Sequence, residues 1–338
     1  MATKEILVNR SHHRQNFSFT PPSFIISSSS RGDQNRMAKL GFLGLGIMGG
    51  PMALHLIGAG HQVALWSFSR GKVEALAAKG GISCDTPAEV ARQSDCIFLC
   101  VGNTEMSRKT ILGKDGLAET AAKGSIIVDC STVSPSASRA IAAELAEKGI
   151  AFLDAPCTGS KGGAEAGTLT FMVGGPKDVF EKVRPYFEAM GKQLYYCGGA
   201  GMGLHAKLSQ NMILGNLLQA FNESLILSTK AGVDPEMMLD ILNNSAAKSG
   251  LISIKAPLVF ARNFTTNFSV KWLEKDMELM LESAAELNVP APLTALSRQL
   301  FRAAIAKGYG EEDICGSIRV MEDIAGCTVA SNPKTQQT

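Results

Sequence analysis

Short apolar runs alternate with helix-like segments from residue 39 to about residue 200. The runs at 40–43, 61–66, 96–101, 125–129, 152–154 and 170–173 predict strands, and continuous apolar runs are typical of strands buried on both faces. Between them, apolar residues recur at helical spacing, as at Ile141, Ala142 and Leu145. This alternation predicts an α/β fold with a doubly wound parallel sheet.

The strand pattern stops after Gly198, and the rest of the chain has a helical pattern. Helices are predicted over 204–230, 271–287, 292–307 and 311–324, and another begins after Asp234. Thr86, Ser134 and Asp234 each precede a proline, and a short polar side chain in that position is typical of a helix N-cap. We therefore expect an all-α helical domain over 201–326 and a flexible tail over 327–338.

Composition places the chain among ordinary globular proteins. It has 338 residues, of which 45% are hydrophobic and 19% charged, enough for one large or two medium domains. A net charge of +2 gives no reason to expect a nucleic-acid partner, and no apolar run has the length of a membrane span. The eight cysteines form no CxxC pair and no cluster with histidine, so we expect neither a metal site nor a disulfide framework.

Residues 1–36 differ in composition from the rest. They contain four arginines and the run Ser27 to Ser30, and their only acidic residues are Glu5 and Asp33. Such a segment cannot bury a core, so we expect a disordered extension. It could be an organelle transit peptide, but no amphipathic helix is visible and Met37 could itself start the protein. We therefore favour a dispensable extension and a cytoplasmic protein.

A glycine-rich turn lies between the first strand and the first helix. It has the pattern Gly44-x-Gly46-x-x-Gly49. In a Rossmann-type fold, the first glycine permits the turn, the second lets a pyrophosphate approach, and the third lets helix and strand pack closely. The phosphates would bind the free N–H groups at the helix N-terminus. We therefore predict a dinucleotide-binding domain over 37–200, in which the cofactor first contacts Gly44, Leu45, Gly46, Ile47, Met48 and Gly49.

The end of the second strand predicts which dinucleotide binds. An acidic residue here would bind the ribose 2′-hydroxyl and repel a 2′-phosphate. The chain has Ser67, Phe68, Ser69 and Arg70 instead. Because two hydroxyls and a guanidinium could hold a phosphate, we predict NADP as the preferred cofactor and leave NAD open.

Four further motifs make the chain resemble the β-hydroxyacid dehydrogenase family. That family includes 3-hydroxyisobutyrate dehydrogenase, tartronate semialdehyde reductase and the glyoxylate/succinic semialdehyde reductases. The glycine turn continues into Pro51-Met52, and three stretches resemble the family's DxST, substrate and catalytic segments: Asp129-Cys130-Ser131-Thr132, residues 154–169, and Gly201-x-Gly203-x-x-x-Lys207-x-x-x-Asn211. Lys275-Asp276-Met277 resembles its KDM segment, and the resemblance spans about residues 38–325.

The resemblance implies further contacts. Substrate-binding residues would be Ser131, Thr132, Thr158, Gly159, Ser160 and Phe268. Cofactor contacts would also come from Val101, Gly102, Asn103, Thr132 and Lys275. The chain departs from the family where its usual Asn-Arg-Thr is 67–69 and its usual Val-Ser is Cys157-Thr158, so Arg70 would have to replace the phosphate-binding arginine.

Lys207 and Asn211 carry the predicted chemistry. They lie four residues apart, on one face of a predicted helix. A partly desolvated lysine near the cofactor would have a lowered pKa and could protonate a carbonyl oxygen, while Asn211 would bind the same oxygen or orient the lysine.

Taken together, the sequence predicts an NADPH-dependent reductase of small aldehyde or 2-oxo acids, closest to the glyoxylate/succinic semialdehyde reductases. The alternatives are an NAD-dependent dehydrogenase of 3-hydroxyisobutyrate or tartronate semialdehyde, and a non-catalytic cofactor-binding module. The expected partners are a small carboxylate substrate and further copies of the chain, as a homodimer or homotetramer. Neither nucleic acid nor membrane is expected to bind.

Overall fold

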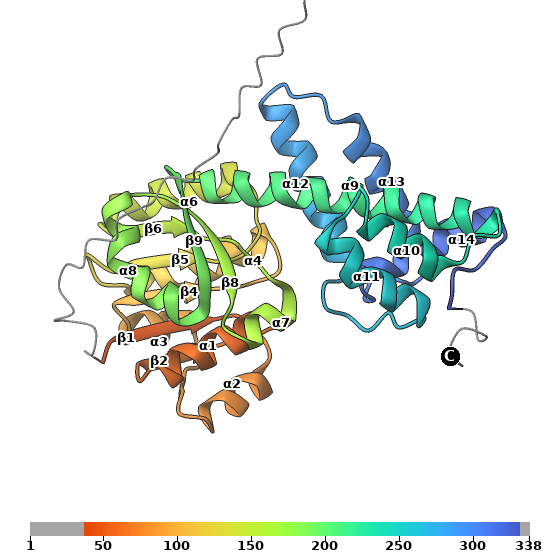
Figure 1. The fold of residues 1–338 in the computed structure, drawn as a ribbon. Helices are drawn as coiled ribbons and strands as arrows, with labels where there is room; N and C mark the ends of the chain where they lie inside the picture. Colours follow the sequence, from red (N-terminus) through yellow and green to blue (C-terminus); the bar gives the residue numbers. More distant parts are fainter. Residues whose placement is uncertain (1–36, 332–338) are drawn as a thin grey trace, which may run out of the picture. The chain divides into compact units, whose positions relative to one another are not determined.

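A computed structural model describes residues 37–331, so the predicted disorder of residues 1–36 lies outside the described residues. The first part contains a sheet covered by helices (Figure 1). Six of its strands, from one edge inward, run parallel in the order β3-β2-β1-β4-β5-β6. These strands are β1 (Lys39–Leu43), β2 (Gln62–Trp66), β3 (Ile82–Ser83), β4 (Cys96–Leu99), β5 (Ile126–Asp129) and β6 (Ala151–Asp154). The predicted doubly wound parallel sheet is confirmed.

An antiparallel extension follows β6. Strand β8 (Leu169–Gly174) runs antiparallel to β6 and to the short β7 (Cys157–Thr158), while β9 (Gly191–Gly198) runs parallel to β8. The sheet therefore has a parallel part, whose first strand leads into the glycine turn, and a mixed edge, from which the chain enters the helical domain.

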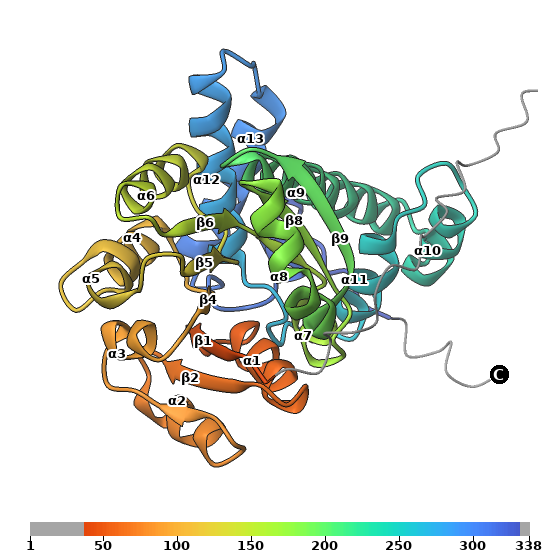
Figure 2. The same cartoon turned by 90° about the vertical axis from the view of Figure 1, so that its left-hand side faces the viewer.

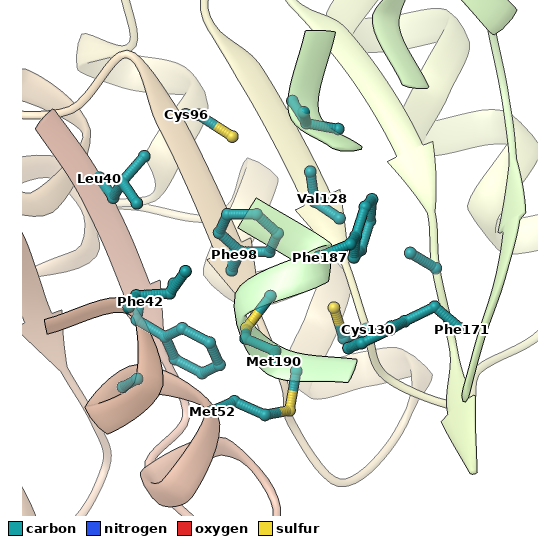
Figure 3. Close-up of a cluster of buried hydrophobic side chains, with 14 of the residues drawn as sticks. Leu40, Phe42, Met52, Cys96, Phe98, Val128, Cys130, Phe171, Phe187 and Met190 are labelled. Atoms are coloured by element: carbon teal, nitrogen blue, oxygen red, sulfur yellow. The ribbon is translucent and has the colours of Figure 1, made fainter. Parts of the chain in front are cut away.

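Helices cover both faces of the sheet, as Figure 2 shows. On one face, side chains of β1, β4 and β5 pack against α1 (Gly49–Gly58) and α8 (Lys177–Met190), with Phe42, Phe98 and Phe187 fully buried between them (Figure 3). On the other face, the alternate side chains pack against α3 (Pro87–Arg92), α4 (Thr104–Leu112), α5 (Leu117–Thr120) and α6 (Pro135–Glu147). Strands buried on both faces explain the continuous apolar runs.

The helical domain is built on α9 (Met202–Lys230). Its apolar core includes Leu218, Phe221 and Leu225 of that helix. The other elements are α10 (Pro235–Asn243), α11 (Gly250–Phe260), α12 (Val270–Glu286), α13 (Pro292–Ala306), η1 (Ile314–Ser317) and α14 (Ile318–Ala325). The predicted helix over 311–324 is thus a 3-10 turn followed by a shorter α-helix.

Local polar contacts define several helix starts. The side chains of Thr86, Ser134 and Asp234 accept hydrogen bonds from backbone N–H groups in the first turns of α3, α6 and α10, so the three predicted N-caps are confirmed. No helix within residues 37–331 is long and apolar enough to cross a membrane.

The segment 327–331, which the sequence assigns to a flexible tail, packs on the helical domain. The side chain of Val329 is fully buried. Its backbone N–H donates to Glu322 at 2.8 Å, and its carbonyl oxygen accepts from Arg262 at 3.1 Å. These contacts attach the segment to the helical domain at Val329, whereas the prediction treats it as part of a flexible tail. The remainder of the predicted tail lies outside the described residues.

Candidate active site

A cavity of about 540 Å³ extends from the glycine turn to the N-terminal halves of α9 and α12. Its walls come from the loops that follow β1, β2, β4 and β5, from α9, and from the segment before α12. The carboxyl ends of parallel strands meet at one edge of a sheet, which is where α/β folds bind ligands. Cavity and topology therefore point to the same site.

The three glycines of the turn have different surroundings. Gly44 has φ +86°, and a Cβ there would lie 2.1 Å from the carbonyl oxygen of Cys100. A Cβ on Gly49 would lie 2.0 Å from the carbonyl oxygen of Gly44. By contrast, a Cβ on Gly46 would meet nothing within 4 Å, and Gly46 lines the cavity. Tight packing at the first and third positions and open space at the second are what a dinucleotide pyrophosphate requires.

At the end of β2, the cavity meets Ser67, Phe68, Ser69 and Lys72 but not Arg70. The guanidinium of Arg70 points away: its Nη1 donates to Asp85 at 2.6 Å and to the carbonyl oxygen of Cys84 at 3.1 Å. The structure thus does not bring Arg70 to the predicted phosphate position, because an acidic neighbour binds it. Lys72, in the first turn of α2 (Arg70–Ala77), lines the cavity in its place.

The loops after β4 and β5 contact each other beneath the cavity. The hydroxyl oxygen of Ser131 accepts a hydrogen bond from the N–H of Val101 at 2.8 Å, and the N–H of Ser131 donates to Asp129 at 2.9 Å. Burial is the main influence that raises the pKa of Asp129. These contacts fix the orientation of Ser131. Asn103 does not line the cavity, because its side chain caps α4 by accepting from Met106 at 2.8 Å.

Lys207 and Asn211 line the cavity from one face of α9, as the sequence predicts. Lys207 is 7% exposed, and burial, the largest influence, lowers its pKa although the charge of Asp276 opposes the shift. Asn211 donates from Nδ2 to Asp276 at 2.7 Å. Its Oδ1 is buried and has no hydrogen-bond partner among residues 37–331. Lys207, whose pKa is lowered, and Asn211, whose buried Oδ1 lacks a partner among the described residues, therefore line the same cavity.

Lys275 links the helical domain to the sheet domain. Its Nζ donates to the carbonyl oxygen of Thr132 at 2.5 Å and lies 3.0 Å from Asp276. Asp276 thus contacts Asn211 and Lys275 together and raises the pKa of Lys207 relative to what burial alone would give. The motif match included Asp276, but sequence reasoning gave this residue no role.

Three residues that were predicted to bind substrate, Thr158, Ser160 and Phe268, also line the cavity. Gly159 does not line it; with φ +131° it turns the chain between β7 and α7 (Ser160–Glu165). The backbone at Phe268 is held by Asp313. The Oδ2 atom of Asp313 accepts hydrogen bonds from the N–H groups of Asn267 and Phe268 at 3.1 and 3.2 Å.

Most predicted site residues therefore lie around one cavity, and Arg70, Asn103 and Gly159 do not line it. Sequence reasoning missed other lining residues, which belong mainly to the helical domain and to the loop ends: Lys72, Cys100, Met106, Cys130, Cys157, Leu214, Thr266, Asn267, Ser269, Trp272, Asp276 and Glu311. Some of these residues, Asp276 above all, lie within or next to the matched motifs, and that position was the signal in the sequence that could have identified them. All eight cysteines are free thiols.

Two domain families match the chain in sequence. Residues 39–199 match the NAD binding domain of 6-phosphogluconate dehydrogenase, and residues 201–321 match the family described as NAD-binding of NADP-dependent 3-hydroxyisobutyrate dehydrogenase. The residues around the cavity fit a nicotinamide dinucleotide, because the turn at Gly46 leaves open space and the cavity extends from there to Lys207.

Individual relatives are similar over most of the chain. 2-(Hydroxymethyl)glutarate dehydrogenase of Eubacterium barkeri is 38% identical over 293 residues, which cover 86% of this chain and 97% of that protein. Glyoxylate/succinic semialdehyde reductase 2, chloroplastic, of Arabidopsis thaliana is 33% identical over 296 residues, which cover 88% and 83%. The solved 3-hydroxyisobutyrate dehydrogenase of Mycobacterium tuberculosis with L-serine has a TM-score of 0.78 at 28% identity and covers 85% of this chain and 99% of its own. These three proteins are named for different substrates.

Proposed function

Because the chain belongs to the β-hydroxyacid dehydrogenase family of NAD(P)-dependent oxidoreductases, we propose that it is an NADPH-dependent reductase of small aldehyde or 2-oxo acids. Glyoxylate and succinic semialdehyde are the leading substrates, supported by the plant relative named for them. The relatives do not resolve the branch, since the identity to the hydroxymethylglutarate enzyme is higher. The observation that carries the proposal is the buried Lys207, which lies in the same cavity as the open glycine turn.

Lys207 is proposed as the proton donor. When bound, the nicotinamide cofactor supplies the hydride to the carbonyl carbon of the substrate. The ammonium group of Lys207 donates a proton to the carbonyl oxygen, and in the oxidative direction the neutral amine accepts it back. Asn211 would accept a hydrogen bond at its free Oδ1 from the resulting hydroxyl or from Lys207. Asp276 holds the amide of Asn211 in place for that role.

The hydroxyls beside Lys207 suit a small carboxylate. Ser131, Thr132, Thr158 and Ser160 all line the cavity, and Ser131 is fixed by its hydrogen bond from Val101. Hydroxyls and backbone N–H groups together can satisfy both oxygens of one carboxylate. Phe268 also lines the cavity and would restrict the length of the substrate.

Initial-rate assays test the proposed function. NADPH and NADH are each combined with glyoxylate, succinic semialdehyde, methylmalonate semialdehyde and tartronate semialdehyde, and NADP⁺ and NAD⁺ with 3-hydroxyisobutyrate. We expect the highest kcat/KM with NADPH and glyoxylate or succinic semialdehyde. A higher value with NAD⁺ and 3-hydroxyisobutyrate would replace this assignment. Cofactor binding without turnover of any substrate would favour the non-catalytic module.

Lys72, rather than Arg70, is proposed to contact the 2′-phosphate of NADPH, together with Ser67 and Ser69. All three line the cavity, whereas Arg70 is paired with Asp85. Lys72→Ala should raise the KM for NADPH by about tenfold or more and change the KM for NADH little, because only NADPH carries the phosphate.

Arg70→Ala is the matched control, because it removes a cation two residues away that does not line the cavity. It should affect the two cofactors about equally. The assignment would be reversed by an Arg70→Ala variant that discriminates between the cofactors while Lys72→Ala does not.

We also propose that copies of the chain pair through the helical domain. Ile213 on α9 and Leu293 and Leu296 on α13 are 70%, 61% and 63% exposed. The two helices are joined by a hydrogen bond from Asn216 to Thr294 at 3.1 Å, so these apolar side chains lie on neighbouring helices. A single copy would leave them in water. Sedimentation equilibrium measures the oligomeric state, and a monomer at micromolar concentration would contradict the pairing.

We propose the cytoplasm as the location of the protein.

A further inference from the structure

The indole of Trp272 lies against Gly102, where the helical domain meets the loop after β4. A Cβ built on Gly102 would lie only 2.7 Å from Cη2 and 3.4 Å from Cζ2 of Trp272. The six-membered ring of the indole therefore occupies the space that a side chain at position 102 would need. Gly102 and Trp272 are therefore complementary in volume.

This contact lies at the topological switch point of the sheet. Strands β1 and β4 are neighbours, and the chain leaves them toward opposite edges of the sheet. The glycine turn after β1 touches the loop after β4, since a Cβ on Gly44 would strike the carbonyl oxygen of Cys100 at 2.1 Å. A ligand of a doubly wound sheet crosses at this point. Trp272 is thus the helical-domain residue placed over the crossing.

Part of the indole remains uncovered. Trp272 is 36% exposed and lines the cavity, so the surface that Gly102 leaves free is available to a ligand. The Nζ atoms of Lys271 and Lys275 lie 5.0 and 5.8 Å from the indole centroid, within reach of a cation–π interaction. Lys275 is in turn bound to Thr132. These contacts hold the ring in position, and each of the two lysines is paired with a carboxylate, Lys271 with Glu311 and Lys275 with Asp276.

We propose that the indole of Trp272 is a cofactor contact, against which the nicotinamide dinucleotide packs from the helical-domain side, and that Gly102 is required to seat it. The inference rests on the proposed function, because it needs the dinucleotide to bind in this cavity. It adds a residue that neither the motifs nor the predicted site contains. Trp272 carries no proton in the reaction; its contribution is to hold the dinucleotide between the two domains.

Fluorescence without substrate gives the first test. The chain has two tryptophans, Trp66 and Trp272, so the Trp66→Phe variant retains Trp272 alone. Titration with NADP⁺ should quench the emission of this variant through contact with the oxidised nicotinamide, which does not absorb at the emission wavelength of tryptophan and therefore takes up no energy at a distance. The matched Trp272→Phe variant, which keeps Trp66, should respond much less. Calorimetry on the same samples measures binding independently of the fluorophore.

The outcomes separate the two proposals. Binding by calorimetry with no change in the emission of Trp272 would overturn the contact and leave the proposed function standing. Absence of binding of both NADPH and NADH to the wild-type protein would overturn both.

A double-mutant cycle tests the role of Gly102. Trp272→Ala and Gly102→Ala should each raise the Kd for NADPH by about tenfold, the first by removing the aromatic surface and the second by displacing it. In a Trp272→Phe background, Gly102→Ala should raise the Kd much less, because phenylalanine lacks the ring atoms that the new methyl group would strike. Thermal unfolding confirms that each variant is folded. An equal effect of Gly102→Ala in both backgrounds would overturn the proposed seating.

Discussion

Replacement of Lys207 by alanine should lower the turnover of the reductive reaction by about 10²- to 10⁴-fold while cofactor binding is retained. Lys207 is buried and belongs to α9 rather than to the glycine turn, so its loss removes the proposed proton donor and leaves the residues proposed to contact the phosphates unchanged. Steady-state kinetics with the best substrate of the panel measure the first effect. Calorimetric titration with NADPH measures the second.

Lys230→Ala is the matched control for this variant. Lys230 is the other lysine of α9, it does not line the cavity, and its Nζ donates to the carbonyl oxygen of Ala325. Its loss should leave turnover close to that of the wild type. Turnover of Lys207→Ala equal to that of the wild type would remove Lys207 from the mechanism.

The pH dependence gives a second readout of the same role. Reduction needs the ammonium form of Lys207, so kcat for reduction should be full below the pKa of Lys207 and fall as the pH rises through it. Oxidation needs the neutral amine, so kcat for oxidation should rise as the pH rises through the same pKa. Because burial lowers this pKa, both limbs should lie below the pH expected for an ordinary lysine. In Lys207→Ala, the limb should disappear from both profiles.

The sequence predicted those parts of the site that depend on local backbone geometry. The glycine turn is such a case: the positive φ of Gly44 and the close contacts of Gly44 and Gly49 follow from short-range constraints that only glycine satisfies. The N-caps at Thr86, Ser134 and Asp234 are also local. The position of Lys207 and Asn211 on one face of α9 follows from their spacing of four residues.

Other parts depend on contacts between residues distant in sequence. Arg70 was predicted as the phosphate contact, but Asp85, fifteen residues later, binds its guanidinium, and no spacing rule reveals that pairing. Asn103, predicted as a cofactor contact, caps α4 by accepting from Met106 only three residues later, so its position outside the cavity lining has a local cause. Helix α11 has no amphipathic pattern and contains Pro257, so periodicity does not predict it. Val329 shows that a segment without helix or strand can still contribute a side chain to the core.

The buried ion pair of Lys255 and Asp313 is another long-range contact, and it gives the second large expected effect. Their side chains are 7% and 0% exposed, and Lys255 Nζ donates to both carboxylate oxygens of Asp313 at 2.7 and 2.8 Å. Lys255→Met should lower the free energy of unfolding by about 3–5 kcal/mol, because it leaves a buried carboxylate without its counter-charge. Urea unfolding followed by circular dichroism measures the change.

The exposed pair of Lys307 and Asp323 provides the control. Its N–O distance of 2.6 Å is similar, but the side chains are 43% and 52% exposed. Solvent screens such a pair, so Asp323→Asn should leave the free energy of unfolding nearly unchanged. Comparable losses in Lys255→Met and Asp323→Asn would show that burial gives the Lys255 pair no special weight.

The same pair should influence the part of the cavity that Phe268 lines, because Asp313 also accepts hydrogen bonds from the backbone N–H groups of Asn267 and Phe268. A double variant, Lys255→Met with Asp313→Leu, removes both charges and avoids a buried unpaired ion, but it leaves those two donors without their acceptor. We therefore expect it to recover only part of the lost stability and to raise the KM for the substrate through displacement of Phe268. Full recovery of both quantities would show that Asp313 does not hold this segment.

Lowering the pH should reduce the contribution of the Lys255–Asp313 pair to the free energy of unfolding. Burial, the largest influence, pushes the pKa of Asp313 upward, but the hydrogen bond and charge of Lys255 and the backbone donors outweigh it, so its pKa in the folded state lies below the ordinary value. The pair therefore stabilises the fold fully above the unfolded-state pKa of about 3.9, and that stability is lost as the pH falls through the lower folded-state pKa. The difference in unfolding free energy between the wild type and Asp313→Asn should accordingly be constant near neutrality and shrink below about pH 4. A difference that persists unchanged at pH 2 would mean that the carboxylate charge contributes nothing and that shape alone holds the segment beneath Phe268.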